Sequence, residues 1–123
     1  MILVMATSSS ISAPSPPIFT GENYHVWSVK IEAYLRGLLL WEAVETDFEA
    51  VLPENPTLNQ LKMYEEKVSR KFRALSSLHS AVNETTFIRI MACKIAKEVW
   101  DKLKSEFQGN EKTKQMQIFN LRK

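Results

Sequence analysis

The side chains that most often carry out catalysis are scarce in this chain, which has 2 histidines and 1 cysteine among 123 residues. Neither His25 nor His79 lies in a recognised metal-binding pattern with Asp, Glu or Cys. We interpret His25 as an exposed helix residue. His79 ends a long segment of helical periodicity, and there an imidazolium would suit the partial negative charge of the last carbonyl groups.

The single cysteine is interpreted as a packing residue. Cys93 lies among Met91, Ala92 and Ile95, a setting typical of a small buried hydrophobe in a helix. A cysteine nucleophile also needs a positioned base, and the sequence offers none. One cysteine allows neither an intrachain disulfide nor a zinc site built on several thiolates.

Other patterns of catalytic or cofactor-binding residues are missing as well. The 3 glycines, at positions 21, 37 and 109, are too far apart to form a phosphate-binding loop. We interpret the acidic residues between 42 and 54 as a solvated rim, because nothing around them indicates burial. The sequence therefore predicts a protein that is not an enzyme, with no metal ligand, no cofactor and no small-molecule substrate.

Basic side chains are more clustered than the catalytic types. The densest cluster consists of Lys67, Arg70, Lys71 and Arg73. Such a cluster can neutralise nucleic-acid phosphates, which makes these four residues candidate contacts and RNA a candidate partner. The nearby Glu65 and Glu66 favour instead a solvated helix face with opposite-charge pairs three and four residues apart. We favour the solvated face, since the aromatic residues do not interleave with the basic ones as base stacking requires.

Composition indicates one small helical domain with a divided charge. Hydrophobic residues make up 45%, and the 3 glycines and 5 prolines leave long stretches free of helix breakers. Residues 18–61 hold seven acidic and two basic side chains, a net charge of −5. Residues 62–123 hold fourteen basic and seven acidic side chains, a net charge of +7, so the overall +2 conceals a polar chain.

The beginning of the chain differs in composition from the rest. Residues 7–17 are rich in Ser and Pro and carry no charge, so we expect residues 1–17 to form a flexible tail and residues 18–123 the folded domain. The apolar run at residues 1–6 is too short, and lacks the basic start, for a signal peptide. No apolar window is long enough to span a bilayer. We expect an intracellular, cytoplasmic protein without a membrane partner.

Apolar spacing predicts the first helices. A helix should begin at Asn23, whose side chain can accept from the free N–H groups of the first turn. Gly37 should permit a bend into a second short helical segment over residues 38–44. The apolar stripe of the first helix that we expect to face the core is Tyr24, Trp27, Ile31, either Tyr34 or Leu35, and Leu38.

A capping-box pattern opens the clearest helix. Thr57 is followed three residues later by Gln60, and each can bond the backbone N–H of the other. The residues expected to be buried along this helix are Leu61, Tyr64, Val68, Phe72, Leu75 and Leu78.

Three further helical segments are expected. Asn83 should cap a short helix that runs to Lys94, and a second helix over residues 96–107 should stop at a left-handed Gly109. The last pattern has no stop signal before the chain ends, from which we expect the natural domain to continue. Its apolar residues are Met116, Ile118, Phe119 and Leu121.

Two blocks of residues resemble a known family. The first is Phe19-x-Gly21-x-Asn23-Tyr24-x-x-Trp27, followed by Leu35 and by Trp41-x-x-Val44. The second runs from Ala96 through Trp100, Leu103 and Phe107 to Gly109. In this order and separation they resemble the Gag polyprotein of Copia-type long-terminal-repeat retrotransposons, over about residues 18–123.

This resemblance implies an all-α fold and a structural function. The expected architecture is a small orthogonal bundle of about five to six helices, like the N-terminal domain of a retroelement capsid. Such Gag chains assemble with one another into particles that enclose RNA. The motif residues are expected to build the fold rather than a site, with Phe19 packing against Trp27 ahead of the first helix.

The chain departs from the family pattern in two respects. Ile95 stands where the family usually has a capping Ser or Thr, and since Ile cannot cap, the helix after it either begins differently or continues from the helix before it. The family's Gag also usually continues into further helices and a zinc knuckle with three cysteines and a histidine, and neither is present. We therefore expect a fragment of the longer protein, whose RNA packaging would lack its dedicated element.

Overall fold

The computed structural model describes residues 15–47 and 49–109, and within them the fold is helical. The described residues contain five α-helices followed by one π-helical turn, which confirms the predicted all-α class and number of helices. In chain order these elements are α2 (Tyr24–Gly37), α3 (Trp41–Glu45), α4 (Leu58–Ser80), α5 (Glu84–Ile90), α6 (Ala96–Leu103) and the π-helical turn η1 (Lys104–Gln108).

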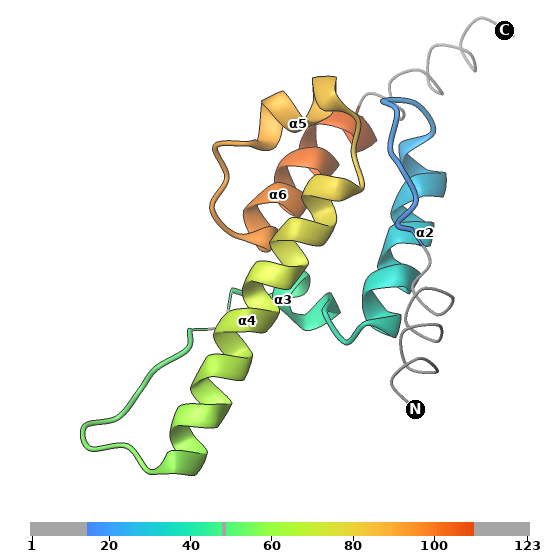
Figure 1. Cartoon of the computed structure of the whole chain (residues 1–123). Helices are drawn as coiled ribbons and strands as arrows, with labels where there is room; N and C mark the ends of the chain where they lie inside the picture. The colour runs from blue at the N-terminus through green and yellow to red at the C-terminus, as the bar shows by residue number, and fades with distance from the viewer. Residues whose placement is uncertain (1–14, 48, 110–123) are drawn as a thin grey trace, which may run out of the picture.

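The longest helix organises the arrangement. α4 packs against α3 and α6, while α2 packs against α3 and η1. Figure 1 shows α4 as a diagonal element whose upper half lies beside α5 and α6 and whose lower end projects beyond the other helices, together with the loop that precedes it. The core therefore gathers around the second half of α4.

Two helix starts follow the local rules that predicted them. At α4, the Thr57 hydroxyl accepts from the Gln60 N–H at 3.1 Å, and the Gln60 side chain accepts from the Thr57 N–H at 2.9 Å. At α5, the Asn83 side-chain oxygen accepts from the Thr86 N–H at 2.9 Å. These hydrogen bonds confirm both predicted caps. They could be predicted because all the atoms involved lie within one helical turn.

The predicted cap at Asn23 is wrong. Asn23 adopts left-handed backbone angles, with φ of 56°, and its side chain makes no capping bond. Together with Gly21, at φ of 96°, it turns the chain so that Tyr24 and Trp27 enter the core. Asn tolerates left-handed backbone angles better than most residues. Asn23 therefore sets the direction in which the chain enters α2 and does not bond the free N–H groups of the first turn.

The predicted roles of Gly37 and Gly109 are also wrong. Gly37 is the last residue of α2, and the left-handed residue of the following turn is Leu39, with φ of 62°. Burial of Leu35 before the tight turn and of Leu40 after it holds Leu39 in this strained conformation. Gly109 has right-handed angles, φ −62° and ψ −41°, so it does not end the helix as a left-handed cap.

The end of α5 and the start of α6 can each be compared with a predicted boundary. α5 ends at Ile90 and does not run on to Lys94. α6 begins after Ile95 with no side-chain cap and is separate from α5, so of the two alternatives the different start is the one observed. The Glu98 carboxylate instead accepts from the Lys94 N–H at 3.0 Å, so one unpaired donor ahead of the helix is satisfied from within its first turn.

The aromatic motif residues form one connected cluster. The Phe19 ring lies 5.0 Å from Trp27, 5.9 Å from Tyr24 and 4.8 Å from Phe107 between ring centres. Trp100 continues the cluster, 5.9 Å from Trp27 and 5.1 Å from Trp41. These edge-to-face and tilted contacts join the segment before α2 with α2, α3, α6 and η1.

Backbone hydrogen bonds also hold Phe19 in place. Its N–H donates to the Ala81 carbonyl at 2.7 Å, and its own carbonyl accepts from the Asn83 N–H at 3.0 Å. The Trp27 indole N–H donates to the Pro17 carbonyl at 3.0 Å. The segment before α2 is thereby attached to the turn between α4 and α5. Residues 1–14 of the tail expected over residues 1–17, and the apolar pattern from Met116 to Leu121, lie outside the described residues.

The apolar stripe of α4 is covered only in part. Ala74 and Leu78 are buried, and Leu75 packs against the core from its edge. Leu61, Tyr64 and Val68 are half-buried, and Phe72 is 65% exposed, so the prediction that the whole stripe is buried is wrong. α4 has 23 residues and a length of about 34 Å, and the helices packed against it are too short to cover its first half.

Replacing Phe19 should test the attachment of the first segment. Phe19 is 1% exposed, and we expect Phe19→Ala to lower the free energy of unfolding by about 3–5 kcal/mol because it opens a cavity at the meeting point of several rings. The neighbouring Ile18 is 53% exposed, and Ile18→Ala should change it by under about 0.5 kcal/mol. Urea unfolding followed by tryptophan fluorescence measures both. Equal effects of the two substitutions would contradict the central position of Phe19.

Candidate functional site

Two of the four predicted basic contact residues form ion pairs and line different hollows. Arg70 pairs with Glu66 at 2.6 Å, and its side chain lines a hollow together with Arg36 and Trp41. Lys71 pairs with Asp47 at 3.7 Å and lines a second hollow. Lys67 and Arg73 are exposed. Half of the cluster that is dense in the sequence is therefore paired to acidic residues.

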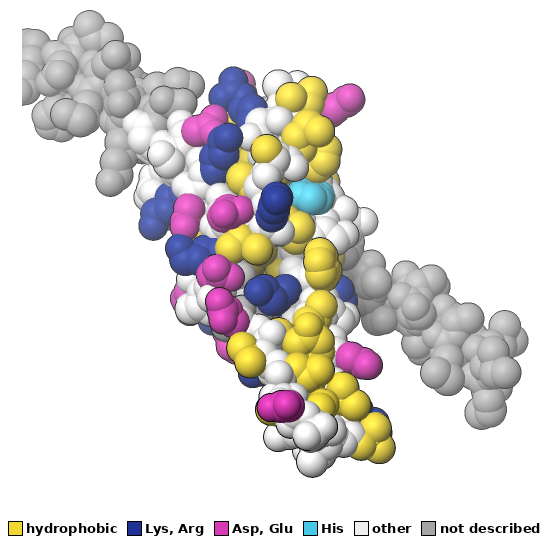
Figure 2. Space-filling model, turned by 90° about the vertical axis from the view of Figure 1, so that its left-hand side faces the viewer, with side chains coloured by type: hydrophobic (Ala, Val, Ile, Leu, Met, Phe, Trp, Pro, Cys, Tyr) yellow, Lys and Arg dark blue, Asp and Glu magenta, His cyan; other side chains and the backbone are white. Residues whose placement is uncertain are grey.

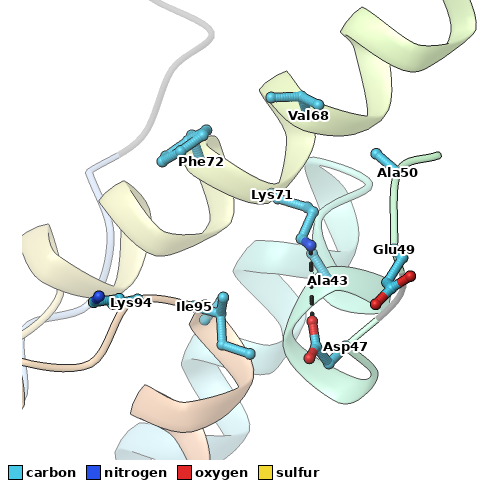
Figure 3. Close-up of a pocket in the computed structure, with 10 residues that line it drawn as sticks. Ala43, Asp47, Glu49, Ala50, Val68, Lys71, Phe72, Lys94 and Ile95 are labelled. Atoms are coloured by element: carbon cyan, nitrogen blue, oxygen red, sulfur yellow. Dashed lines mark ion pairs between the residues drawn. The ribbon is translucent and has the colours of Figure 1, made fainter. Parts of the chain in front are cut away.

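The hollow beside Lys71 is the most clearly built concavity near the basic cluster. It encloses about 370 Å³ between α4, the end of α3, the following loop and the start of α6. Figure 3 shows Val68 and Phe72 along one wall and Lys71 reaching across to Asp47. The remaining lining residues are Ala43, Glu49, Ala50, Lys94, Ile95 and Ala96.

The end of α3 and the start of α6 bring acidic and basic side chains to the same hollow. α3 ends where the Thr46 N–H and hydroxyl both donate to the Glu42 carbonyl at 3.0 Å, after which the chain is extended and carries Asp47 toward α4. Lys94 comes from the other side, just ahead of α6. The result is an apolar wall with a charged rim, which suits an aromatic or aliphatic group that has a polar tip.

His79 lies in the last turn of α4, as predicted, but its surroundings differ from those expected. It is half-buried, its ring meets Phe87 edge-on at 5.0 Å, and its Nε2 is buried without a hydrogen-bond partner. Burial lowers the pKa of His79 below its ordinary value of 6.5. The expected imidazolium at the helix end is therefore wrong, because loss of solvent outweighs the attraction of the last carbonyls.

The other two candidates for chemistry serve as local parts of the fold. His25 is exposed on α2, as predicted. Cys93 is half-buried against the core, but it lies in the turn between α5 and α6, where its N–H donates to the Ile90 carbonyl at 2.9 Å, and not in a helix. Within residues 15–47 and 49–109, no three His, Cys, Asp or Glu side chains come together as a metal site would require.

Comparison with known families decides the relationship of this chain. Residues 31–123 match the family model described as the gag-polypeptide of LTR copia-type. The chain belongs to this family. The copia-type Gag family is structural, which agrees with motif residues that build a core. No significant match was found among curated proteins or among solved structures.

The matched region of this Gag-family chain contains most of the elements described above. It takes in α3, α4, α5, α6 and η1 completely, and the second half of α2. The hollow and all four basic candidates lie inside it. None of the helices in the described part of the chain combines the length and the apolar character needed to cross a bilayer.

The partial exposure of the apolar stripe of α4 and the hollow that lies beside it were not predicted from the sequence. A signal was available in the lengths alone. The capping box and the absence of breakers predicted a helix of more than twenty residues, and no other predicted element was long enough to cover it. The Lys71–Asp47 pair carried no such signal, since the two residues lie far apart in the sequence and meet only through the fold.

The buried His79 predicts a pH dependence of stability. Its pKa is lower in the folded chain than in the unfolded chain, so the unfolded chain binds more protons as the pH falls through about 6.5, and folding stability is lost on acidification. The free energy of unfolding of the natural chain should therefore fall more steeply between about pH 7 and pH 5 than that of His79→Leu. Urea unfolding at each pH measures the difference.

His25 supplies the control for this experiment. Because it is exposed, His25→Gln should keep the acid-dependent loss of the natural chain. Parallel pH profiles for the natural chain and His79→Leu would show that the His79 environment does not disfavour its protonated form.

Proposed function

We propose that this chain is a structural Gag domain whose task is to associate with other copies of itself, in an assembly that packages RNA, and that it catalyses no reaction. The match to the copia-type Gag family over residues 31–123 carries this proposal. The aromatic motif residues support it because they are used in the core and leave the outer surface as the part available for partners.

The uncovered surface of α4 is further support for association. Helices in a small globular domain normally turn their apolar stripe toward the core, and single exposed apolar residues are unremarkable. Here a run of apolar positions over several turns of one helix faces outward, including Leu58 and Phe72. An apolar surface of this length costs free energy in water, and contact with another chain removes that cost.

Self-association should be measurable in the isolated chain. We expect the weight-average mass in sedimentation equilibrium to rise with protein concentration from the monomer value of 14.2 kDa. The rise should persist at high salt, because apolar contacts are not weakened by ionic screening. A monomer mass at every concentration up to about the millimolar range, which corresponds to a binding free energy of about −4 kcal/mol, would contradict the proposal.

RNA contact through the basic cluster is the second candidate function. It is favoured by the exposure of Lys67 and Arg73 on α4. The ion pairs of Arg70 and Lys71 argue only weakly against it, since partly exposed pairs of this kind contribute little and can exchange a carboxylate for a phosphate. The location of Arg70 and Lys71 in different hollows is a further argument against it, because part of the cluster is turned away from a shared surface.

Salt titration of RNA binding tests this second function. If all four basic residues neutralise phosphates, replacing Lys67, Arg70, Lys71 and Arg73 with Gln should flatten the slope of log affinity against log salt by about 2.8 for single-stranded RNA. Replacing Lys94, Lys97, Lys102 and Lys104 with Gln provides a control of equal charge. An equal loss in both variants would indicate unspecific attraction, and an absence of binding near physiological salt would exclude the function for this chain.

A further inference from the structure

The uncovered stripe of α4 has the same pattern in both directions. Counted from Val68, an aromatic residue lies four positions away on each side, Tyr64 and Phe72, and a leucine lies seven positions away on each side, Leu61 and Leu75. The spacing of three, four, four and three keeps all five on one side of the helix. They extend over about 21 Å of α4, and we call them the α4 stripe.

The α4 stripe is accessible along most of its length. Phe72 is 65% exposed, Leu61, Tyr64 and Val68 are half-buried, and only Leu75 belongs to the edge of the core. Figure 2 looks onto the side of the molecule where α4 and its preceding loop lie, and it shows hydrophobic side chains in a nearly continuous column toward the lower end. At Val68 and Phe72 this surface borders the hollow whose opposite side is formed by Ala43 of α3 and Ala96 of α6.

We propose that the α4 stripe is a contact between two copies of this chain, whose α4 helices pack antiparallel about a two-fold axis at Val68. The proposal rests on the self-association proposed above and names its surface. In such a pair Val68 meets Val68 of the second copy once, on the axis, while the contacts of Tyr64 with Phe72 and of Leu61 with Leu75 each occur twice. Because the pattern reads nearly the same in both directions, this symmetry places an aromatic ring opposite an aromatic ring and a leucine opposite a leucine.

The hollow beside Lys71 supports the antiparallel direction. Tyr64 and Lys71 are seven residues apart and so lie on the same flank of α4, which is also the flank of the hollow. In an antiparallel two-fold pair, equal flanks face each other and Tyr64 of the second copy arrives at the level of Phe72. Its ring then enters the hollow between Val68 and Phe72, and its hydroxyl can donate to the carboxylate of Asp47 or Glu49. A parallel pair would leave this hollow unfilled.

The contact is a single helix pair, smaller than the roughly 800 Å² per partner of a standard stable interface, so each pair should be weak and should depend on concentration.

A charge exchange at Val68 tests the two-fold axis. In the natural sequence the axis brings residue 68 against itself, so Val68→Glu and Val68→Lys should each weaken association at least tenfold, because two equal charges meet in an apolar contact. An equimolar mixture of the two variants should recover association, since opposite charges then meet. Sedimentation equilibrium measures all three samples, and circular dichroism melts establish that each variant is folded.

The matched control is a charge of the same kind on another exposed apolar residue. Ile88 on α5 is 61% exposed and lies outside the α4 stripe, so Ile88→Glu should leave association unchanged. If Ile88→Glu and Val68→Glu weaken association equally, or if the mixture of Val68→Glu and Val68→Lys fails to recover it, the proposed axis is wrong.

Disulfide formation provides an independent geometric test. In a chain carrying Cys93→Ser, Val68→Cys should form a dimer on mild oxidation, because the two residues would lie within the about 7 Å between Cα atoms that a disulfide allows. Tyr64→Cys and Phe72→Cys should form the mixed dimer in preference to either dimer with itself. Preferential dimers of each variant with itself would indicate parallel packing and overturn the proposal.

The outcomes separate this proposal from the proposed function. Association of the natural chain that is unaffected by Val68→Glu would overturn the α4 stripe as the contact and leave self-association standing. A monomer at all concentrations would contradict both. Slow alkylation of Val68→Cys in the dilute monomer would show that another segment of the same chain covers the α4 stripe, which also overturns the proposal.

Discussion

The position of Phe19 is the constraint on which most of this small fold depends. Its ring contacts rings from α2 and from η1, and its backbone is bonded on both sides to the turn between α4 and α5. One residue ahead of the first described helix thereby connects segments from both ends of the described chain. A domain with so little core obtains much of its order from a few large rings, and Trp27 and Trp100 extend the same contact to α3 through Trp41.

Features determined within one helical turn could be predicted from the sequence, and features determined by distant contacts could not. The caps at Thr57 and Asn83 needed only their own neighbours. Asn23 and Leu39 adopt left-handed angles because buried residues beside them fix the path of the chain, which overrides the local preferences of Asn for capping and of Gly37 for the turn. For the same reason the sequence located His79 at the helix end and could not reveal its contact with Phe87.

The candidate surfaces show the same division. The charge separation along the sequence is real, but folding brings part of the acidic half against the basic half, and Lys71–Asp47 is the ion pair that joins them across the hollow. Ion pairs such as Arg70–Glu66 and Lys97–Asp101 are neighbours on single helices. A cluster counted along the sequence therefore overestimates the charge presented in one direction, and the hydrophobic pattern of α4 gives more information about partners than its basic residues do.

The projecting first half of α4 separates the parts of the chain that specify the fold from those open to a partner. Substitutions at Leu61 or Tyr64 touch little of the aromatic cluster, so this surface can change during evolution while the core stays intact. Two related chains could then share one architecture and still refuse to pair, because a single mismatched charge or ring in a two-fold contact is met twice. In a cell that holds several diverged copies of such a gene, the exposed helix would sort each product with its own kind.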